Sequence, residues 1–455
     1  MTAFVSINPY TEKHIHQFLL IGDGTLEEVL SKAKEVQREW RLISFEKRGA
    51  YFLKLAELIK THQQELAELA VLEMGKPIKE ASAEVLKCTT ACTYYAAQSE
   101  RILSNSTSIA DTGKTVDVLY EPMGVVLGVF PWNFPYWQII RSAVPIVMAG
   151  NTVLIKPAPN VPKCSMALQN LFHQAGFPEG VLQTIFAEES QVANLIADDR
   201  IKAVTLTGSE KAGSIVASQA AKHIKRAILE LGGSDPFIVL EDADLIAAAD
   251  TAITARFQNN GQSCIASKRF ILHKSIADKF INLLKERMTK LVLGDPMEAS
   301  VDIGPMARKD LRDKLKSQVD DTIKLGGQII FQHPQDFLKG FFFPPTILTH
   351  IPKYSPAYNE ELFGPVLSVF IVENATEAIH LANDTTFGLG ASVWTNNKEL
   401  GNDMAKALEC GTVFINGLVK SNAAYPFGGA KHSGFGRELG EWGIREFCNV
   451  KTIWK

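Results

Sequence analysis

The chain has 455 residues, of which 46% are hydrophobic and 21% are charged, and its formal net charge is −3. This length exceeds what one hydrophobic core usually serves, so two or three domains are expected, and the slightly acidic balance argues against nucleic acid or an anionic membrane as a partner. Because no apolar run reaches the ~18 residues of a membrane span and the N-terminus lacks the regions of a secretory signal, a cytoplasmic protein is expected.

The first hundred residues are predicted to be mostly helical. Thr25 followed by Glu28 has the pattern of a capping box, and apolar residues recur at helical spacing over 26–40. A second helix is predicted over 52–72, with Gly75 just beyond it as a C-terminal cap.

Short apolar runs alternate with helical stretches from about residue 120 onward. In chain order the predicted elements are strand 125–130, strand 153–155, helix 162–175, strand 203–206, helix 210–222 and strand 227–229. Such alternation predicts a largely parallel sheet that is covered by helices.

A second set of strands and helices follows the segment 232–236, where a domain boundary is expected. The strands predicted in this set are 237–240, 269–272 and 366–370. Either Asp242 or Asp244 is placed to cap a helix over 247–255.

Two segments belong to neither set. Residues 105–122 are predicted to form a two-stranded ribbon, and residues 448–455 a terminal strand. Both could be packing edges within the chain, and both could equally be open edges that pair with another subunit.

The cysteines and histidines indicate reduced thiols and no catalytic metal. The six cysteines form no C-x-x-C pair and the ten histidines form no H-x-x-x-H. Cys88 and Cys92 share a helical face with apolar neighbours and are predicted core residues. Cys264 differs, because it follows the polar, amide-rich run 257–263, and a loop of this kind would present the sulfur to a reactant. The alternative is a buried structural cysteine.

Polar groups follow the predicted strands of the first set. In an open α/β sheet, ligands bind outside the carboxyl ends of the strands. The groups found there are Asn133, Lys156, Thr207-Gly208-Ser209 and Glu230. Residues 208–213 do not form a P-loop, since Ser214 rather than lysine follows, but they join a strand to a helix, where backbone N–H groups can hold a pyrophosphate. Together with Cys264, these positions predict one site.

Seven segments carry a more specific pattern. They are Pro131-Trp132-Asn133-Phe134-Pro135, Lys156-Pro157-Ala158, Thr207-Gly208-Ser209, Leu229-Glu230-Leu231-Gly232-Gly233, Gly261-Gln262-Ser263-Cys264, Glu361-Leu362-Phe363-Gly364-Pro365 and Pro426-Phe427-Gly428-Gly429. On these segments the chain resembles the aldehyde dehydrogenase superfamily along nearly its full length. Residues 232–237 and the ending 447–455 are most similar to the bacterial succinate-semialdehyde dehydrogenases of the short type.

The resemblance implies an α/β fold of the aldehyde dehydrogenase type. A Rossmann-type NAD(P)-binding domain would comprise residues 1–104 and 123–231, and an α/β catalytic domain residues 232–424. The segments 105–122 and 438–455 would serve oligomerisation, in a homodimer or homotetramer.

The resemblance also implies catalytic roles. Cys264 would attack the aldehyde carbon, Asn133 would stabilise the oxyanion, and Glu230 would activate the water that hydrolyses the thioester. Relatives that form acyl-CoA lack a carboxylate at the position of Glu230, so a free acid product is expected. Taken alone, Asn133 could instead cap the following helix, and Glu230 could be an ordinary loop residue.

A set of cofactor-binding residues follows from the same resemblance. It comprises Trp132, Lys156, Pro159, Gly208, Ser209, Glu361 and Phe363. Many NAD-dependent relatives have glutamate three residues after this lysine, where it repels the 2′-phosphate of NADP. Pro159 neither bonds nor repels, so either NAD or NADP is expected, with a lean toward NAD.

The expected reaction is oxidation of succinate semialdehyde to succinate. Arg141 matches an arginine that would bind the distal carboxylate, although it could also be a surface residue. Gln258 replaces a second arginine of some relatives, and Ser421, Asn422 and Phe427 would complete the pocket. The alternative substrates are glutarate semialdehyde and medium-chain aldehydes. A thiol hydrolase and a non-catalytic protein are alternatives from other classes.

Overall fold

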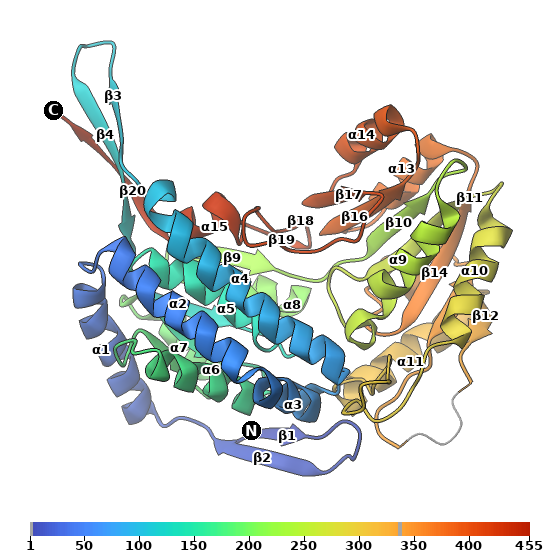
Figure 1. Ribbon diagram of the computed structural model, residues 1–455, viewed down its shortest axis with the longest axis horizontal. Coiled ribbons are helices and arrows are strands. Elements are labelled where there is room, and N and C mark those ends of the chain that lie inside the picture. The colour runs from blue at the N-terminus through green and yellow to red at the C-terminus, as the bar shows by residue number, and fades with distance from the viewer. Residues whose placement is uncertain (1–2, 335–338) are drawn as a thin grey trace.

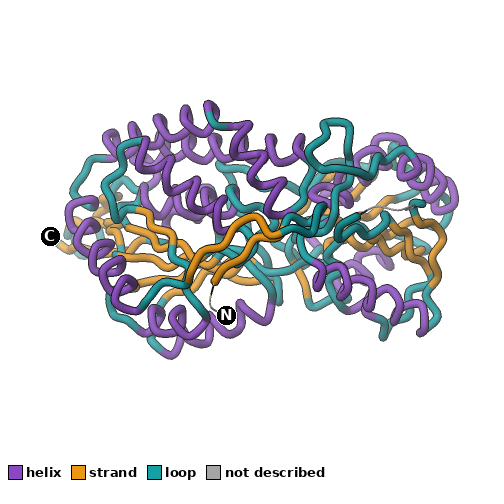
Figure 2. Tube along the Cα trace, turned by 90° about the horizontal axis from the view of Figure 1, so that it is seen from below, coloured by secondary structure: helices purple, strands orange, loops and turns teal. Residues whose placement is uncertain are grey.

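Two helix-covered sheets and one projecting ribbon make up the molecule (Figure 1). The computed structural model describes residues 3–334 and 339–455. Helices lie above and below the strands in both lobes (Figure 2), as the alternation of strands and helices predicted. Within the described residues, no helix is both long and apolar enough to cross a membrane.

The first sheet has six strands in the order β19-β9-β8-β5-β6-β7. These are β5 (Val125–Val129), β6 (Thr152–Lys156), β7 (Leu182–Thr184), β8 (Ile201–Thr207), β9 (Arg226–Glu230) and β19 (Gly434–Phe435). All pairs are parallel except β19 with β9. The helices between the strands are α5 (Trp137–Met148), α6 (Pro162–Gln174), α7 (Glu189–Ala197) and α8 (Glu210–Lys222). The four predicted strands are confirmed, and the three-residue β7 was too short to predict.

The N-terminal region differs from the prediction in detail. It contains β1 (Ala3–Ile7), β2 (His14–Leu19), α1 (Asp23–Trp40), α2 (Phe45–Thr61), α3 (Gln63–Met74) and α4 (Ile78–Ile102). The predicted capping box is wrong, because α1 begins two residues before Thr25 and is preceded by Gly22 with no side-chain cap. The second predicted helix is divided at His62 into α2 and α3. Gly75 caps α3 in the left-handed region, as predicted, with φ of 78°.

The second sheet has seven strands in the order β12-β13-β14-β11-β10-β16-β17. These are β10 (Asp235–Val239), β11 (Ser267–His273), β12 (Gln328–Gln332), β13 (Thr346–Thr349), β14 (Val366–Val372), β16 (Gly390–Trp394) and β17 (Thr412–Ile415). Its helices are α9 (Leu245–Phe257), α10 (Ala277–Thr289), α11 (Lys309–Lys324), α12 (Pro356–Asn359), α13 (Ala375–Asn383) and α14 (Lys398–Ala407). Asp244 caps α9, because its Oδ1 accepts the N–H groups of Ile246 and Ala247 at 3.1 Å.

The chain crosses from the first sheet to the second between Glu230 and Asp235. It returns near its end, through the antiparallel pair of β15 (Phe387–Gly388) with β18 (Ala430–Lys431) and then through β19 and α15 (Gly440–Arg445). The returning segment brings residues 426–438 next to the carboxyl end of β9.

The ribbon is a three-stranded sheet of order β20-β4-β3. It consists of β3 (Ser106–Ile109), β4 (Thr115–Pro122) and β20 (Cys448–Trp454). The strand β20 pairs with β4 from Cys448 opposite Pro122 to Trp454 opposite Val116. The two segments that matched neither sheet therefore pair with each other, and the ribbon extends away from the helices (Figure 1).

Helix α5 is buried along its whole length. Its N-terminus is capped from another helix, because Glu84 Oε1 of α4 accepts the N–H groups of Tyr136 and Trp137 at 2.9 Å each. Glu84 Oε2 pairs with the buried Lys76 ammonium. An anionic cap at a helix N-terminus is favourable in the field of the helix dipole, and here it fixes the helix that carries Gln138 and Arg141.

Candidate active site

A cavity of about 800 Å³ lies between the two sheets. From the first sheet it is lined by Trp132, Asn133, Thr207, Gly208, Ser209 and Gly232, and from the second by Cys264, Glu361, Phe363 and Phe387. Most of these residues follow the carboxyl ends of strands, where ligands of parallel sheets bind. The volume is within the range of small-molecule and cofactor sites.

The loop before Cys264 is held by its own amide side chains. Asn259 and Asn260 lie in the left-handed region, with φ of 57° and 56°, inside a 3-10 turn over Gln258–Gly261. Asn259 Nδ2 donates to the carbonyl oxygens of Asn133 and Gln262 at 2.7 and 3.0 Å. The amide-rich run is therefore buried and structural, and only Cys264 at its end reaches the cavity.

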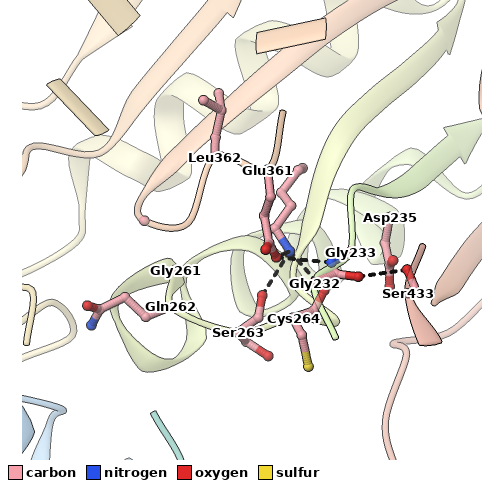
Figure 3. A network of polar contacts seen from close by, with 12 residues as sticks. Gly232, Gly233, Asp235, Gly261, Gln262, Ser263, Cys264, Glu361, Leu362 and Ser433 are labelled. Carbon is pink, nitrogen blue, oxygen red and sulfur yellow. Dashed lines mark hydrogen bonds and ion pairs between the residues drawn. The ribbon is translucent and has the colours of Figure 1, made fainter. Parts of the chain in front are cut away.

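Lys268 connects the loop that ends at Cys264 with Glu361, which lines the cavity from the side of the second sheet. Its ammonium donates to the carbonyl oxygens of Ser263 and Cys264 at 2.9 and 2.8 Å, and it lies 3.0 Å from Glu361 Oε1. The N–H of Gly233 also donates to that oxygen, at 3.1 Å. The sulfur of Cys264 points away from this network (Figure 3). Lys268 was not predicted from the sequence, where its only signal was a charged residue at the start of a strand that is buried over Ser267–Leu272.

The Cys264 thiol is protonated in the protein without cofactor or substrate. Burial raises its pKa to about 12, and the positive charges of Arg141 and Lys268 oppose the rise. The thiolate is the nucleophilic form, so anything that brings further positive charge or hydrogen-bond donors to the sulfur would activate it.

Asn133 is held with its amide in one orientation. Its Oδ1 accepts a hydrogen bond from Gln138 Nε2 at 2.9 Å, and its Nδ2 donates to the Gln262 carbonyl oxygen at 3.0 Å. No described residue takes the second hydrogen of Nδ2, which remains available to a ligand in the cavity. The side chain does not cap α5, since Glu84 does so. Gln138 was also missed by the sequence analysis.

Glu230 is a buried carboxyl group at the end of β9. Neither of its oxygens has a hydrogen-bond partner among the described residues. Burial and the neighbouring Glu438 raise its pKa well above the ordinary value, and Arg141 and Arg437 oppose this. Glu230 also acts on the pKa of Cys264, so it lies within electrostatic range of the sulfur. Glu230 is not among the residues that line the cavity, and neither of its oxygens is committed to a described residue.

The expected cofactor residues divide into two groups. Trp132 and Phe363 form an edge-to-face aromatic pair at 5.8 Å in the cavity wall, and Glu361 Oε2 bonds to no described residue. Ser209 caps α8 by accepting the N–H of Ala212 at 3.3 Å, so the N-terminus of this helix faces the cavity as a pyrophosphate would require.

Lys156 and Pro159 lie outside the described cavity lining. Lys156 ends β6 with its ammonium 5.2 Å from the centre of the Phe4 ring, and burial lowers its pKa. Pro159 lies three residues after Lys156, in the turn before α6. The cavity size, the helix N-terminus and the free oxygen of Glu361 fit a dinucleotide.

The residues expected to bind the substrate differ in their burial and in their hydrogen-bond partners. Arg141 is buried, with its Nε 2.5 Å from Glu438 Oε2, one Nη 3.1 Å from Thr207 Oγ1 and its guanidinium 5.1 Å from the centre of the Phe427 ring. Gln258 begins the turn before the nucleophile, and exposed Asn422 accepts the N–H of Ala424 at 2.9 Å. Ser421 Oγ accepts hydrogen bonds from Lys87 Nζ and Trp137 Nε1.

A cysteine that faces a cofactor-sized cavity at the carboxyl ends of parallel strands is the arrangement of an enzyme that can hold its substrate covalently. The chain belongs to the aldehyde dehydrogenase family, whose sequence profile matches residues 2–453. The expected α/β fold is confirmed by the solved structures that it resembles.

Three similar proteins have names that state an activity. A protein of Synechocystis named probable succinate-semialdehyde dehydrogenase [NADP(+)] is 47% identical, with 99% of each chain covered. Succinate semialdehyde dehydrogenase [NAD(P)+] of Escherichia coli K12 is 41% identical, with 100% and 98% covered. The structure of succinic semialdehyde dehydrogenase from Streptococcus pyogenes with NADP+ is 35% identical and superposes with a TM-score of 0.97 over 99% of each chain. The expected lean toward NAD is not confirmed, because all three names include NADP.

Proposed function

We propose that the chain oxidises succinate semialdehyde to succinate with a nicotinamide cofactor, through a thiohemiacetal and then a thioester on Cys264. The observation that carries the proposal is that Cys264 and the free N–H of Asn133 line the same cavity, with the unbonded carboxyl of Glu230 in electrostatic range. The names of relatives that are 41–47% identical over the whole chain support the substrate.

Three residues carry the proposed steps. The Cys264 thiol releases its proton to solvent, and Sγ attacks the aldehyde carbon as the carbonyl π bond breaks. The oxygen that becomes negative accepts hydrogen bonds from Asn133 Nδ2 and the Cys264 backbone N–H. Losing one such donor typically raises the barrier by about 2.7–4 kcal/mol. When bound, the cofactor takes up the hydride that the substrate carbon releases. Glu230 then accepts a proton from the water that hydrolyses the thioester. Only the ionised carboxylate can accept this proton. Burial raises the pKa of Glu230 and so disfavours that form.

A panel of aldehydes tests the proposal. Succinate semialdehyde, glutarate semialdehyde and butanal are each assayed with NADP and with NAD by the absorbance of the reduced nicotinamide. Succinate semialdehyde is expected to give the highest kcat/KM. Equal or higher values for butanal would overturn the proposed substrate while leaving the family chemistry intact.

A broad aldehyde dehydrogenase is the second candidate, for a specific reason. The charge of Arg141, which was expected to bind the substrate carboxylate, is matched by Glu438. If no other cation replaces it, uncharged aldehydes would be accepted as well, and the same panel separates the two functions.

We also propose that NADP is accepted at least as well as NAD. Pro159 presents no carboxylate to repel a 2′-phosphate, and NADP stands in the names of the relatives. Pro159→Glu would add a negative charge near that phosphate, and like charges repel at short range. We expect kcat/KM with NADP to fall by about tenfold or more, while the value with NAD changes by less than about threefold. Equal losses with both cofactors would contradict this placement.

A further inference from the structure

Lys87 of α4 is a partly buried cation with no matching negative charge. Its ammonium donates to Ser421 Oγ at 2.9 Å and lies 4.5 Å from the centre of the Trp137 ring. Within residues 3–334 and 339–455, no carboxylate forms an ion pair with it, whereas Lys76, which lies just before the first residue of α4, is paired with Glu84. A half-buried ammonium without a partner is costly, which suggests that a ligand supplies the charge.

Ser421 has a hydroxyl hydrogen that is not used. Its Oγ accepts hydrogen bonds from Lys87 Nζ and from Trp137 Nε1, at 2.9 and 3.1 Å. A hydroxyl oxygen has two lone pairs, so both acceptor positions are filled and the O–H can only donate. No described residue accepts it, although the side chain is only 7% exposed. The O–H of Ser421 and two N–H groups of Lys87 therefore await acceptor oxygens.

The Lys87–Ser421 pair contacts helix α5, which also carries Gln138 and Arg141, although neither Lys87 nor Ser421 lines the cavity of about 800 Å³. Trp137, which contacts both residues, immediately precedes Gln138, and Gln138 holds Asn133. Arg141 lies one turn further along α5, and its charge lowers the pKa of both Lys87 and Cys264. Burial first and Arg141 second bring the pKa of Lys87 to about 8, so Lys87 is mostly charged at neutral pH.

We propose that Lys87 and Ser421 bind the distal carboxylate of the aldehyde substrate. The inference rests on the proposed semialdehyde substrate and names the residues that recognise it. One carboxylate oxygen accepts from the ammonium of Lys87, and the carboxylate also accepts the O–H of Ser421. Arg141, whose charge is matched by Glu438, shapes this end of the pocket without supplying its net charge.

The test compares Lys87→Met with Lys87→Arg on two substrates of similar length, succinate semialdehyde and butanal. Methionine keeps the unbranched side chain and removes the charge. A hydrogen-bonded ion pair contributes enough that its loss lowers kcat/KM by about 10- to 100-fold. We expect this loss for the semialdehyde, mainly through KM, with butanal changed by less than about threefold. Arginine should restore most of the difference. Lys420→Met, which removes an exposed lysine beside the pocket, is the matched control and should change neither substrate.

Binding without turnover gives a second measurement. Succinate should inhibit the wild-type enzyme competitively against the aldehyde, and Lys87→Met should weaken this inhibition by a similar factor. Equal losses for both substrates in Lys87→Met, or unchanged succinate inhibition, would overturn the inference. If the wild-type enzyme shows no preference for the semialdehyde over butanal, the proposed substrate itself fails. A wild-type preference that survives in Lys87→Met would overturn the role of Lys87 alone.

Discussion

Lys268 couples the sulfur to the wall that would hold the cofactor, because one ammonium contacts the carbonyl oxygens of Ser263 and Cys264 and the carboxylate of Glu361. Its charge also lowers the pKa of the Cys264 thiol. Lys268→Met should therefore raise that pKa and slow alkylation by iodoacetamide at pH 8 by about 3- to 10-fold, since one pKa unit corresponds to a tenfold change in thiolate. Lys268→Arg should retain most of the rate, and Lys274→Met, an exposed pair partner of Glu373, should match the wild type.

The pH profile distinguishes this charge effect from local unfolding. With a pKa of about 12 in the cofactor-free protein, the thiol is protonated throughout the neutral range. The alkylation rate should then rise about tenfold per pH unit from pH 7 to 10 without a plateau, because only the thiolate reacts. A plateau at pH 8 to 9 would show an ordinary exposed thiol. A Lys268→Met protein that reacts faster than wild type would show that its loop has opened instead.

At the scale of elements, the contact between α4 and α5 supports the site. Glu84 caps α5 and neutralises Lys76, and both side chains are buried. Glu84→Gln keeps the shape but leaves a buried ammonium unpaired, which typically lowers the free energy of unfolding by about 3–5 kcal/mol. We expect a clear drop in Tm, measured by differential scanning fluorimetry, and partial recovery in the double variant Lys76→Met with Glu84→Gln. Glu286→Gln, in an exposed pair, should leave Tm unchanged; an equal Tm for Glu84→Gln would contradict the argument.

Part of the fold and part of the cavity lining could be predicted from the sequence alone. Ligands of an α/β sheet bind at its strand ends, so apolar runs followed by polar residues were sufficient to predict the sheet and the place of Asn133 in the cavity lining. The catalytic roles of Asn133 and Glu230 stay predictions. Lys87 and Lys268 could not be found in this way. The role of Lys87 depends on Ser421, which is 334 residues away in the chain, and no local pattern records such a contact.

Some helix caps could be predicted from the sequence and others could not, because only some caps come from residues next to their own helix. Gly75 and Asp244 act within one turn of their own helices; Gly75 was the predicted cap, and Asp244 was one of two predicted candidates. The cap of α5 comes from Glu84, 52 residues earlier than Tyr136, so Asn133 stood as an alternative cap until the tertiary structure was known. Charge balance is equally non-local, since the ion pair of Arg141 with Glu438 joins residues that are far apart in the chain.

At the scale of the whole molecule, the ribbon of β3, β4 and β20 leaves apolar side chains uncovered. Val450 is 55% and Trp454 58% exposed, and they share one face of β20 because they are four residues apart in a strand. Exposed apolar groups on a projecting ribbon indicate an interface. We predict that the protein is a homodimer or homotetramer through this ribbon, and that Val450→Lys combined with Trp454→Lys lowers the solution mass toward the 50.1 kDa of one chain.

Size-exclusion chromatography with light scattering measures the mass directly. Ile224→Lys is the matched control, because Ile224 is 96% exposed but lies at the end of α8 rather than in the ribbon, and it should keep the wild-type mass. A wild-type mass equal to one chain, or a ribbon variant that keeps the wild-type mass, would contradict the predicted interface. The ribbon does not contribute to the cavity lining, so a dissociated variant that remains folded should retain its cofactor and aldehyde preferences, and loss of assembly can be separated from loss of the site.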